Sequence, residues 1–509
     1  MFFDMPTEHF DVLIVGAGLS GIDAAHHLQT LCPGKTYVIL EQRERIGGTW
    51  DLFRYPGIRS DSDMLTMGYS FRPWTQPKAI SPGNLIRDYI TDTARDEGID
   101  THIRFQHAIQ SASWSSAEAA WTVEAVRNPE GQRVTFTCNF LFSCAGYYRY
   151  SAGYLPEFPG MERFGGMMVH PQSWPSDVDY AGKRVLIIGS GATAVTLLPS
   201  MAKTAGHVTM LQRSPTYIVS APEEDKVANF LRTVLPPMWA YRLSRWKNVA
   251  FMTFLYQFSQ MFPNLIKKQL LNAVKNELPA DYDVATHFTP TYKPWEQRIC
   301  LVPDADMFQA ISSGRASVVT DQIESFTEKG VLLKSGKLLE ADIVVTATGL
   351  VMQAYGGMAL TVDGRAVDLS ETLAYKGVML SGVPNMASVF GYINASWTLK
   401  ADLICEYVCR LLNYMDSKGA RMVTPNRKGA KAVAQFVVKF SSGYMQRALQ
   451  EWPKQGSEKP WRVYQNYIRD VIALRWASMN DGTLEYSKLA EKPRAVGSTI
   501  PTAGFRKSA

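Results

Sequence analysis

The sequence of 509 residues predicts an α/β fold with two Rossmann-like domains and an inserted helical subdomain. Three observations carry this prediction. An apolar strand, a glycine-rich turn and a helix follow one another at residues 11–28. The same succession returns at residues 183–202. A long aromatic segment, roughly residues 222–294, then interrupts the strand–helix alternation.

The first unit, FDVLIVGAGLSGIDAAHHLQ, is typical of a dinucleotide-binding turn. Gly16 permits the tight turn, Gly18 lets the backbone approach a pyrophosphate, and Gly21 lets the helix pack closely on the strand. The next apolar strand ends at Glu41, 20 residues after Gly21. Its carboxylate can accept hydrogen bonds from ribose hydroxyls, so this unit predicts a nucleotide site.

The second unit, KRVLIIGSGATAVTLLPSMA, fits the related pattern GxGxxA after an apolar strand. Its turn consists of Gly189, Ser190, Gly191, Ala192, Thr193 and Ala194. The following strand leads into Arg213 and Ser214 without an acid. An arginine there suits a 2′-phosphate, although a surface arginine is the alternative. The first unit ends at an acid and the second at an arginine, and together they predict that the protein binds FAD and NADPH.

Composition excludes several other classes of protein. The net charge is +6, but the charges are interspersed, which argues against nucleic-acid binding. Six scattered cysteines without a CxxC pair predict reduced thiols and a cytoplasmic protein, and eight dispersed histidines predict no metal site. We expect no signal peptide and no transmembrane segment. The apolar stretch at residues 249–258 leaves a peripheral membrane contact open, and the oligomeric state is undetermined.

Two further segments carry a resemblance to a known family. GGTWDLFRYPGIRSD, residues 47–61, and FGGMMVHPQSWP, residues 164–175, are each an ordinary structured loop when taken alone. Together they resemble the motifs of type I Baeyer–Villiger monooxygenases, [A/G]-G-x-W-x4-[F/Y]-P-[G/M]-x3-D and F-x-G-x3-H-x3-W-P. The second motif is complete, with Phe164, Gly166, His170, Trp174 and Pro175 in place. PWEQRICLVP and YINASWTLKADL are similar to the ethionamide-activating subgroup, and the resemblance extends from residue 10 to about residue 490.

The resemblance implies a reaction. NADPH reduces FAD, the reduced flavin and O2 give a C4a-peroxide, and this converts ketones to esters or lactones and also sulfoxidises thioethers. The position that matches the catalytic arginine of the family is Arg298. An arginine stays protonated and can hold an anion in a dry site, so we expect Arg298 to stabilise the peroxide and the developing adduct. Asp61 is its expected partner.

The resemblance also implies cofactor contacts. For FAD these are Ser20, Glu41, Thr49, Trp50, Asp51, Asp61 and the backbone of Ile109. Arg59, Ser60 and Asp61 are expected near the nicotinamide, and the turn Gly189, Ser190, Gly191, Ala192, Thr193, Ala194, Val195 with Arg213 and Ser214 holds the rest of NADP. His170 is expected to orient the linker between the domains. Gln297 replaces a lysine found in many relatives, which predicts a weaker preference for NADPH over NADH.

These assignments divide the chain into three parts. Residues 1–150 begin the FAD domain, residues 151–349 form the NADP domain with its helical insertion at about 222–294, and residues 350–509 complete the FAD domain and end in a loose tail. We expect most aromatic side chains of the insertion to be core, with a few lining an apolar tunnel. The aromatic side chains concerned are Trp239, Trp246, Phe251, Phe254, Tyr256 and Phe258.

Three alternative functions remain open. A flavin monooxygenase that oxygenates nitrogen or sulfur through a hydroperoxide has a similar fingerprint, but usually lacks the Trp174-Pro175 pair. A flavin disulfide reductase needs a redox-active cysteine pair, and the nearest candidates, Cys405 and Cys409, are spaced CxxxC. A non-catalytic nucleotide sensor would not need both phosphate turns together with Arg298.

Overall fold

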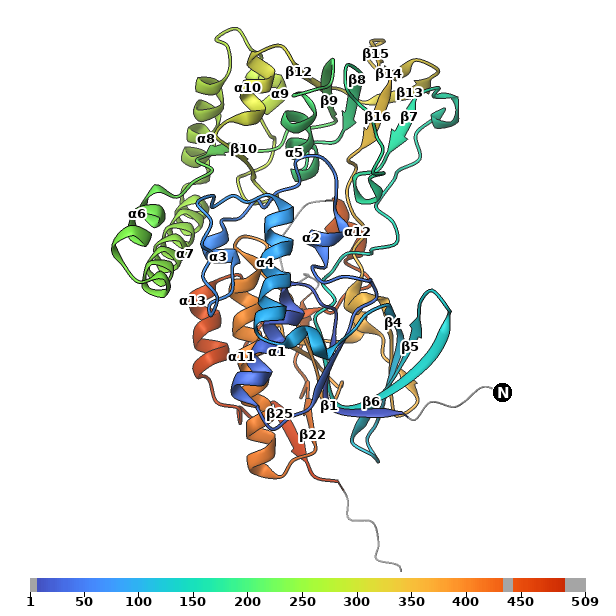
Figure 1. The fold of residues 1–509 in the computed structure, drawn as a ribbon, viewed down its shortest axis with the longest axis vertical. Helices are drawn as coiled ribbons and strands as arrows, with labels where there is room; N and C mark the ends of the chain where they lie inside the picture. Colours follow the sequence, from blue (N-terminus) through green and yellow to red (C-terminus); the bar gives the residue numbers. More distant parts are fainter. Residues whose placement is uncertain (1–6, 434–442, 490–509) are drawn as a thin grey trace, which may run out of the picture.

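The computed structural model describes residues 7–433 and 443–489, and it has two lobes that are each built around a sheet. The larger sheet lies in the lower part of Figure 1 and the smaller sheet in the upper part. The expected α/β fold with two Rossmann-like domains is confirmed. The tail expected after residue 490 lies outside the described residues.

In the described part of the chain, the larger sheet has nine strands and contains the first glycine-rich turn. From edge to edge its strands are β18 (Arg365–Ala366), β17 (Ala359–Val362), β4 (His107–Ser115), β5 (Ala120–Arg127), β6 (Gln132–Ser143), β1 (Glu8–Val15), β2 (Tyr37–Leu40) and β3 (Ile103–Arg104), with β21 (Met386–Ser388) also paired to β6. β1 is parallel to both β2 and β6. The carboxyl ends of these strands therefore meet at one edge, where the turn and Glu41 lie.

Helices cover this sheet and meet one another across sequence. α1 (Leu19–Leu31) packs against α11 (Trp397–Lys418), and α4 (Gly83–Asp96) packs against both α1 and the short α2 (Thr49–Leu52). α3 (Met64–Met67) contacts α11. The side chains that pack where α1 meets α11 are almost fully buried, and they belong to the main core of the lobe. Residues after 350 thus return to the lobe in which the chain began.

The smaller sheet consists, within the described residues, of five parallel strands. Their order is β12 (Ala316–Thr320), β9 (His207–Gln212), β8 (Arg184–Ile188), β16 (Ile343–Thr346) and β7 (Met167–Val169). α5 (Ala192–Met201) packs on β8 and β9, and α10 (Asp306–Ser312) packs on α5. The second glycine-rich turn joins β8 to α5, as in a Rossmann unit.

The inserted helical subdomain is confirmed between the parallel strands β10 (Ile218–Ala221) and β11 (Cys300–Pro303). Its helices are α6 (Lys226–Val234), α7 (Pro237–Met261), α8 (Pro263–Glu277) and α9 (Val284–Phe288). In Figure 1, α6 and α7 lie at the left edge of the molecule, beside the boundary between the lobes.

The expectation that most aromatic side chains of this subdomain are core is wrong. Four of them are 54–65% exposed: Trp239, Trp246, Phe251 and Phe254. The other two, Tyr256 and Phe258, are half-buried. The physical reason is that polar side chains take up part of the inner face of α7, beside Ala240, Tyr241 and Val249. Arg245 is 7% exposed and Ser244 is 1% exposed.

The remaining elements are short. They are β13 (Ile323–Thr327), β14 (Gly330–Leu333), β15 (Leu338–Glu340), β19 (Ala374–Tyr375), β20 (Met379–Leu380), β22 (Met422–Pro425), β23 (Ala432–Val433), β24 (Gln455–Gly456), β25 (Leu484–Ser487), α12 (Gly443–Ala448) and α13 (Tyr467–Asp470), with a π-helical turn at Val471–Trp476. All six cysteines lie in the described ranges and are buried and unpaired.

Candidate active site

Both glycine-rich turns have the geometry that a dinucleotide needs. Gly16 has a φ of 95°, and a Cβ on Gly21 would lie 1.9 Å from the Gly16 carbonyl oxygen, so a side chain at Gly21 is excluded. Gly18 and Gly191 occupy the N-cap positions of α1 and α5. Glycine has no side chain to cap a helix, which leaves the first backbone N–H groups available to an anion.

Glu41 stands at the carboxyl end of β2 beside the first turn. Its Oε2 accepts a hydrogen bond from the backbone N–H of Ala17 at 2.8 Å, and its Oε1 accepts one from Arg43 at 2.9 Å. Burial raises the pKa of Glu41, although these hydrogen bonds oppose the shift. Each carboxylate oxygen keeps a further lone pair that can accept a ribose hydroxyl.

The segment at residues 47–61 approaches the first turn closely. A Cβ on Gly48 would lie 3.1 Å from the Cα of Gly18, and the Thr49 hydroxyl lies 3.5 Å from the Tyr150 hydroxyl. Trp50 is partly buried against the core of the larger lobe. Asp51 has a side chain that is 1% exposed. A carboxylate buried in this way is stabilised by cationic partners.

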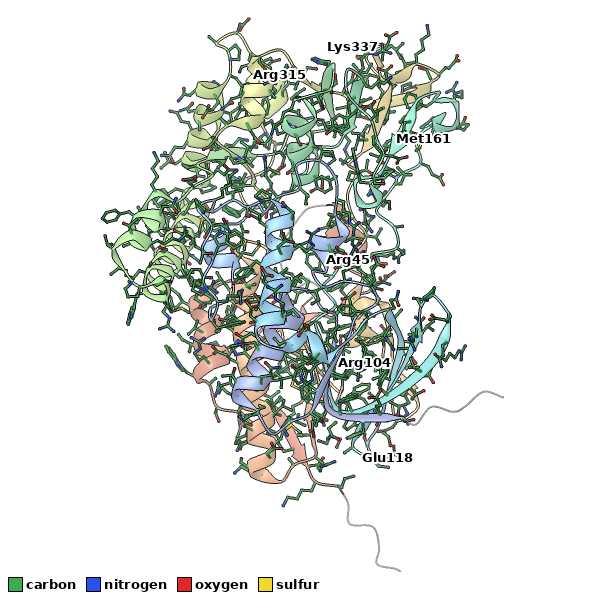
Figure 2. All side chains as sticks on the ribbon, in the orientation of Figure 1. Arg45, Arg104, Glu118, Met161, Arg315 and Lys337 are labelled. Atoms are coloured by element: carbon green, nitrogen blue, oxygen red, sulfur yellow. The ribbon has the colours of Figure 1, made fainter. Side chains whose placement is uncertain are left out.

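Three arginines surround the Asp51 carboxylate. Arg43 forms an ion pair with it, Arg54 donates to it at 3.3 Å, and Arg45 lies 3.5 Å from it. Arg45 is labelled in Figure 2, on the side of α2 that faces the lower lobe. Glu44 also pairs with Arg45 at 3.1 Å, so these arginines lie in an ion-pair cluster beside the turn, and their N–H donors suit a bound pyrophosphate.

Arg298 and Asp61 come together, as the resemblance implies. Arg298 Nη2 donates to Asp61 Oδ1 at 2.6 Å, and the two side chains are 37% and 28% exposed. The neighbours of Asp61 contact protein groups. Arg59 forms an ion pair with Asp306 of α10, and the Ser60 hydroxyl accepts a hydrogen bond from the backbone N–H of Ser81 at 3.2 Å. No pattern in the sequence predicts that Asp306 pairs with Arg59.

A cavity of about 820 Å³ opens beside this ion pair. Asp61, Arg298 and Asn394 line it at the junction of the lobes, and α7 and α8 line its other side with apolar residues. Its volume accommodates a drug-sized organic molecule. The polar wall therefore places a cation next to a largely apolar space.

The surroundings of the second turn fit a second nucleotide. A Cβ on Gly189 would lie 2.3 Å from the Ala347 carbonyl oxygen, so the backbone directly after β16 excludes a side chain there. A Cβ on Gly191 would meet no atom of the described chain within 4 Å. The Ser190 hydroxyl donates to the Ser214 carbonyl oxygen at 3.2 Å, and the side chain of Arg213 is exposed beside it.

The rest of this turn belongs to α5. Ala194 and Val195 are buried in the core of the smaller lobe, whereas Ala192 and Thr193 lie nearer its surface. Gln297 is partly buried next to Arg298. Ile109 lies in β4, where it packs against the core of the larger lobe.

The fingerprint at residues 164–175 is only partly a linker. Its residues Met167–Val169 form β7, the edge strand beside β16, and a Cβ on Gly166 would lie 2.5 Å from the Asp342 carbonyl oxygen. Phe164 and Trp174 are partly buried against two cores of the smaller lobe. Pro175 is exposed.

His170 has a structural setting. Its Nδ1 accepts a hydrogen bond from the backbone N–H of Gln172 at 3.2 Å, and a Cβ on Gly153 would lie 1.9 Å from its ring. Burial lowers the pKa of His170, which favours the neutral imidazole. Gln172 in turn donates to the carbonyl oxygens of Arg149 at 2.8 Å and Tyr150 at 3.1 Å. Gln172 thus ties the fingerprint to the larger lobe, a role that the sequence motif does not reveal.

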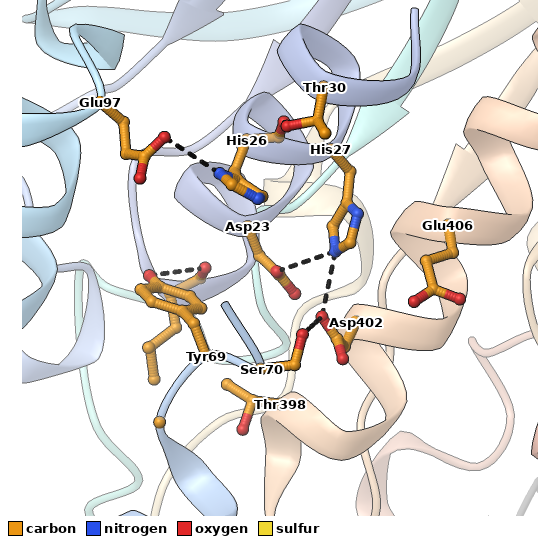
Figure 3. A network of polar contacts seen from close by, with 12 residues as sticks. Asp23, His26, His27, Thr30, Tyr69, Ser70, Glu97, Thr398, Asp402 and Glu406 are labelled. Carbon is orange, nitrogen blue, oxygen red and sulfur yellow. Dashed lines mark hydrogen bonds and ion pairs between the residues drawn. The ribbon is translucent and has the colours of Figure 1, made fainter. Parts of the chain in front are cut away.

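Behind the first turn lies a buried polar network that sequence reasoning missed (Figure 3). His27 of α1 lies 3.0 Å from Asp402 of α11 and 3.5 Å from Asp23, and the Ser70 hydroxyl also donates to Asp402. Burial opposes protonation of His27, but the hydrogen bond to Asp402 and the charge of Asp23 raise its pKa to about 9. At the start of α11, Trp397 donates to the Ser20 hydroxyl at 2.8 Å.

Comparison with known proteins shows to which protein family the chain belongs. The family model described as "FMO-like: Flavin-binding monooxygenase-like" matches residues 10–356. Similar curated relatives are "FAD-containing monooxygenase EthA" of Mycobacterium tuberculosis, 54% identical over 96% of this chain and 100% of the relative, and "Probable FAD-binding monooxygenase AlmA" of Acinetobacter baylyi, 49% identical over 96% and 99%. The chain therefore belongs to the FMO-like family of flavin-binding monooxygenases.

Similar solved structures share the fold. "Oxidized steroid monooxygenase bound to NADP" has a TM-score of 0.74 at 22% identity, covering 94% of this chain and 100% of that one. "Open crystal structure of cyclohexanone monooxygenase" has a TM-score of 0.72 at 20% identity, covering 95% and 100%. The protein is a flavin-dependent monooxygenase with the fold of the Baeyer–Villiger enzymes, and its cofactors are FAD and NADPH.

The site fits both cofactors. The uncapped helix N-termini at Gly18 and Gly191 can each receive a pyrophosphate. Glu41 at the first turn suits the ribose of FAD, and Arg213 at the second suits the 2′-phosphate of NADPH. When bound, these cofactors supply the reducing equivalents and the activation of O2.

Proposed function

We propose that this monooxygenase converts ketones to esters or lactones, and also oxygenates thioethers to sulfoxides. In the first reaction a ketone, O2, NADPH and a proton give an ester, water and NADP⁺. One oxygen atom enters the carbon–carbon bond beside the carbonyl and the other leaves as water, while NADPH is oxidised by two electrons.

The observation that carries this proposal is the ion pair of Arg298 and Asp61 in the wall of the cavity. Attack on a carbonyl carbon places negative charge on oxygen, and a fixed guanidinium beside the substrate stabilises that charge. Arginine keeps its proton in such a site, so the positive charge is present throughout the reaction.

Asp61 acts by positioning Arg298. Its carboxylate accepts from one terminal nitrogen of the guanidinium, which fixes the orientation of this planar group. The pair moderates the positive charge without removing it. We assign Asp61 to positioning and Arg298 to contact with the reacting oxygen.

The apolar part of the cavity determines what can bind. Residues of α7 and α8, including Met252, Leu255 and Leu270, offer no charge to a substrate. Such walls exclude water and hold the alkyl groups of a ketone or a thioether. The substrate class is therefore a neutral, lipophilic carbonyl or sulfide.

Product analysis tests this proposal. The holoenzyme is given NADPH, O2 and either a ketone or a thioether, and the products are identified by mass spectrometry. We expect an ester from the ketone and a sulfoxide from the thioether. Sulfoxide formation with an unchanged ketone would contradict the proposal and would favour the nitrogen- and sulfur-oxygenating alternative.

A further inference from the structure

The outward face of α7 carries a row of large apolar side chains, with exposed Arg242 and Gln257 among them. Trp239, Leu243, Trp246, Phe254 and Met261 are 49–65% exposed. Their separations of 4, 7, 15 and 22 residues from the first are close to multiples of the helical period, so they form one stripe. At a rise of about 1.5 Å per residue, the stripe is roughly 35 Å long.

The inward face of α7 is mixed: Ala240, Tyr241 and Val249 are buried beside Ser244 and Arg245. Buried Arg245 donates from Nη1 to the carbonyl oxygens of Thr66 at 2.9 Å and Gly68 at 2.7 Å. Asn248 donates to Asp63 at 3.0 Å. A helix that has water on its outer side normally turns its largest apolar side chains inward, so large apolar side chains outside and a buried arginine inside indicate an apolar environment outside α7.

Neighbouring elements extend the same surface, which we call the apolar face. The Trp246 and Tyr467 ring centroids lie 5.9 Å apart, so α13 adjoins α7. α6 and α8 lie against α7 on its other sides. Besides the α7 stripe, the exposed side chains of the apolar face are Val227, Phe230, Val234, Phe251, Phe262, Leu265, Ile468, Ile472 and Trp476.

The charge of this region identifies the kind of partner. Residues 226–277 contain one acidic residue, Glu277, and eight lysines and arginines, of which Arg245 is buried and Lys247 pairs with Asp225. Exposed Lys226, Arg242, Lys268 and Lys275 are among them. A second copy of the chain would bring the same positive charge against itself, whereas anionic headgroups would complement it. Tryptophans beside basic residues are typical of the boundary between water and lipid.

We propose that the apolar face docks on an anionic lipid bilayer. The helices would lie in the interface with their aromatic stripe among the acyl chains and their lysines and arginines at the headgroups. In the described ranges, residues 7–433 and 443–489, the structure contains no helix long and apolar enough to cross a bilayer. Docking parallel to the surface needs no such helix.

The cavity connects the apolar face with Arg298. Val227 of α6 and Phe251 of α7 both line the cavity, and they are 51% and 60% exposed. Phe251 is three residues from Phe254 of the stripe, so this end of the cavity opens at the apolar face. Asp61 and Arg298 line the same cavity. A compound dissolved in the bilayer could therefore enter without passing through water.

An entrance to the cavity from the bilayer favours certain substrates over others. This conclusion about substrates rests on the proposed function. Short ketones dissolve in water and gain little from such an entrance. Ketones and thioethers with long alkyl chains partition into a bilayer, since every CH2 group removed from water favours the bilayer. We assign lipophilic, long-chain carbonyl and sulfide compounds as the preferred substrates.

Vesicle flotation of the full-length holoenzyme tests the docking. The probes are vesicles of phosphatidylcholine with and without phosphatidylglycerol. Wild type should float with the anionic vesicles and much less with the neutral ones, and salt should weaken the association. Trp239→Ser combined with Phe254→Ser should lower the partition coefficient about tenfold or more. Leu31→Ser with Leu338→Ser, which replaces residues 41% and 40% exposed elsewhere, should float like wild type.

Three outcomes would overturn the docking proposal. The first is wild type that floats with neither kind of vesicle, or equally with both. The second is a Trp239→Ser/Phe254→Ser variant that floats as well as wild type. The third is a wild-type oligomer that this variant converts to a monomer without any vesicle binding, which would make the apolar face a contact between copies. Retained flavin absorbance shows that each variant is folded.

Turnover measurements distinguish a failure of the docking proposal from a failure of the proposed function. NADPH consumption is measured with a short ketone in water and with a long-chain ketone dissolved in the anionic vesicles. The Trp239→Ser/Phe254→Ser variant should keep the first rate and lose the second about tenfold. Equal loss of both rates, or of neither, would contradict entry through the apolar face. If wild type oxidises no ketone, the proposed function fails, whereas the flotation result still decides the docking.

Discussion

Arg298 and Asp61 are 237 residues apart in the chain, yet Nη2 of the arginine lies 2.6 Å from Oδ1 of the aspartate at the cavity wall. The ion pair joins the residue two positions before β11 to Asp61, which lies in the loop after α2. The position of the guanidinium therefore depends on how the two lobes meet. Substitution of Asp61 therefore tests directly whether this residue positions the guanidinium of Arg298.

We expect Asp61→Asn to bind FAD but to form ester more slowly, by about ten- to a hundredfold, because the guanidinium loses the charge that fixes it. The measurement is kcat for ester formation beside the flavin absorbance. Asp177→Asn, which changes an exposed acid of the smaller lobe, is the control. An Asp61→Asn enzyme with the kcat of wild type would show that the pair has no positioning role.

Arg213 is predicted to read the 2′-phosphate of NADPH. Arg213→Ala should raise KM for NADPH by about tenfold or more and leave KM for NADH nearly unchanged, since only NADPH carries that phosphate. Arg315, labelled in Figure 2, is an exposed arginine of the same lobe, and Arg315→Ala should change neither value. Similar increases for both cofactors would remove Arg213 from phosphate recognition.

The space beside Gly191 provides a test of the second turn. A methyl group there meets no described protein atom within 4 Å, and the φ of Gly191 is −79°, which suits alanine. Gly191→Ala should therefore fold and bind FAD normally but bind NADPH about tenfold or more weakly, because the methyl group occupies the space for the pyrophosphate. Titration with NADP⁺ measures this change.

Alanine substitutions at two other glycines serve as controls for that result. Gly21→Ala would place Cβ 1.9 Å from the Gly16 carbonyl oxygen and should abolish FAD binding or folding. Gly34, whose Cβ would also meet nothing described within 4 Å, should accept alanine without effect. Undiminished NADP⁺ affinity in Gly191→Ala would place the pyrophosphate elsewhere.

The network around His27 predicts how stability depends on pH. The pKa of His27 is raised from 6.5 to about 9, so the folded state binds a proton more tightly than the unfolded state. The resulting stabilisation is complete below pH 6.5 and is lost as the pH rises through 9. Burial raises the pKa of Asp23, which adds to the loss in the same direction. The His27 contribution is at most about 3 kcal/mol.

His27→Gln removes the titrating group and tests this prediction. Wild type should lose free energy of unfolding between pH 6.5 and 9, and the His27→Gln variant should lose distinctly less, whatever its starting stability. Denaturant unfolding at a series of pH values measures both. Parallel pH profiles for the two proteins would show that His27 does not carry the effect.

The two nucleotide units could be predicted from the sequence because backbone geometry dictates their residues. Gly16, Gly21 and Gly189 occupy positions where φ or a close backbone contact excludes other side chains, so the pattern is local and readable. The pair of Arg298 and Asp61 came from resemblance to a family. Local sequence patterns alone do not join residues so far apart.

The parts that could not be predicted depend on tertiary packing. The apolar period of α7 is visible in the sequence, but the usual rule turns such a stripe inward, and here Arg245 is buried while the stripe faces outward. The partners Asp306 and Gln172 likewise depend on how the lobes and loops meet. No spacing in the sequence connects Asp306 with Arg59.

The central claim is that Arg298 enables insertion of oxygen beside a carbonyl, and the most direct measurement combines ¹⁸O2 with an Arg298→Ala variant. Wild type should convert a ketone to an ester that carries one ¹⁸O atom, with NADPH consumed in equal amount. Arg298→Ala should still bind FAD and oxidise NADPH, but ester formation should fall by about 10²–10³-fold. Labelled ester formed by Arg298→Ala at the wild-type rate would contradict the account.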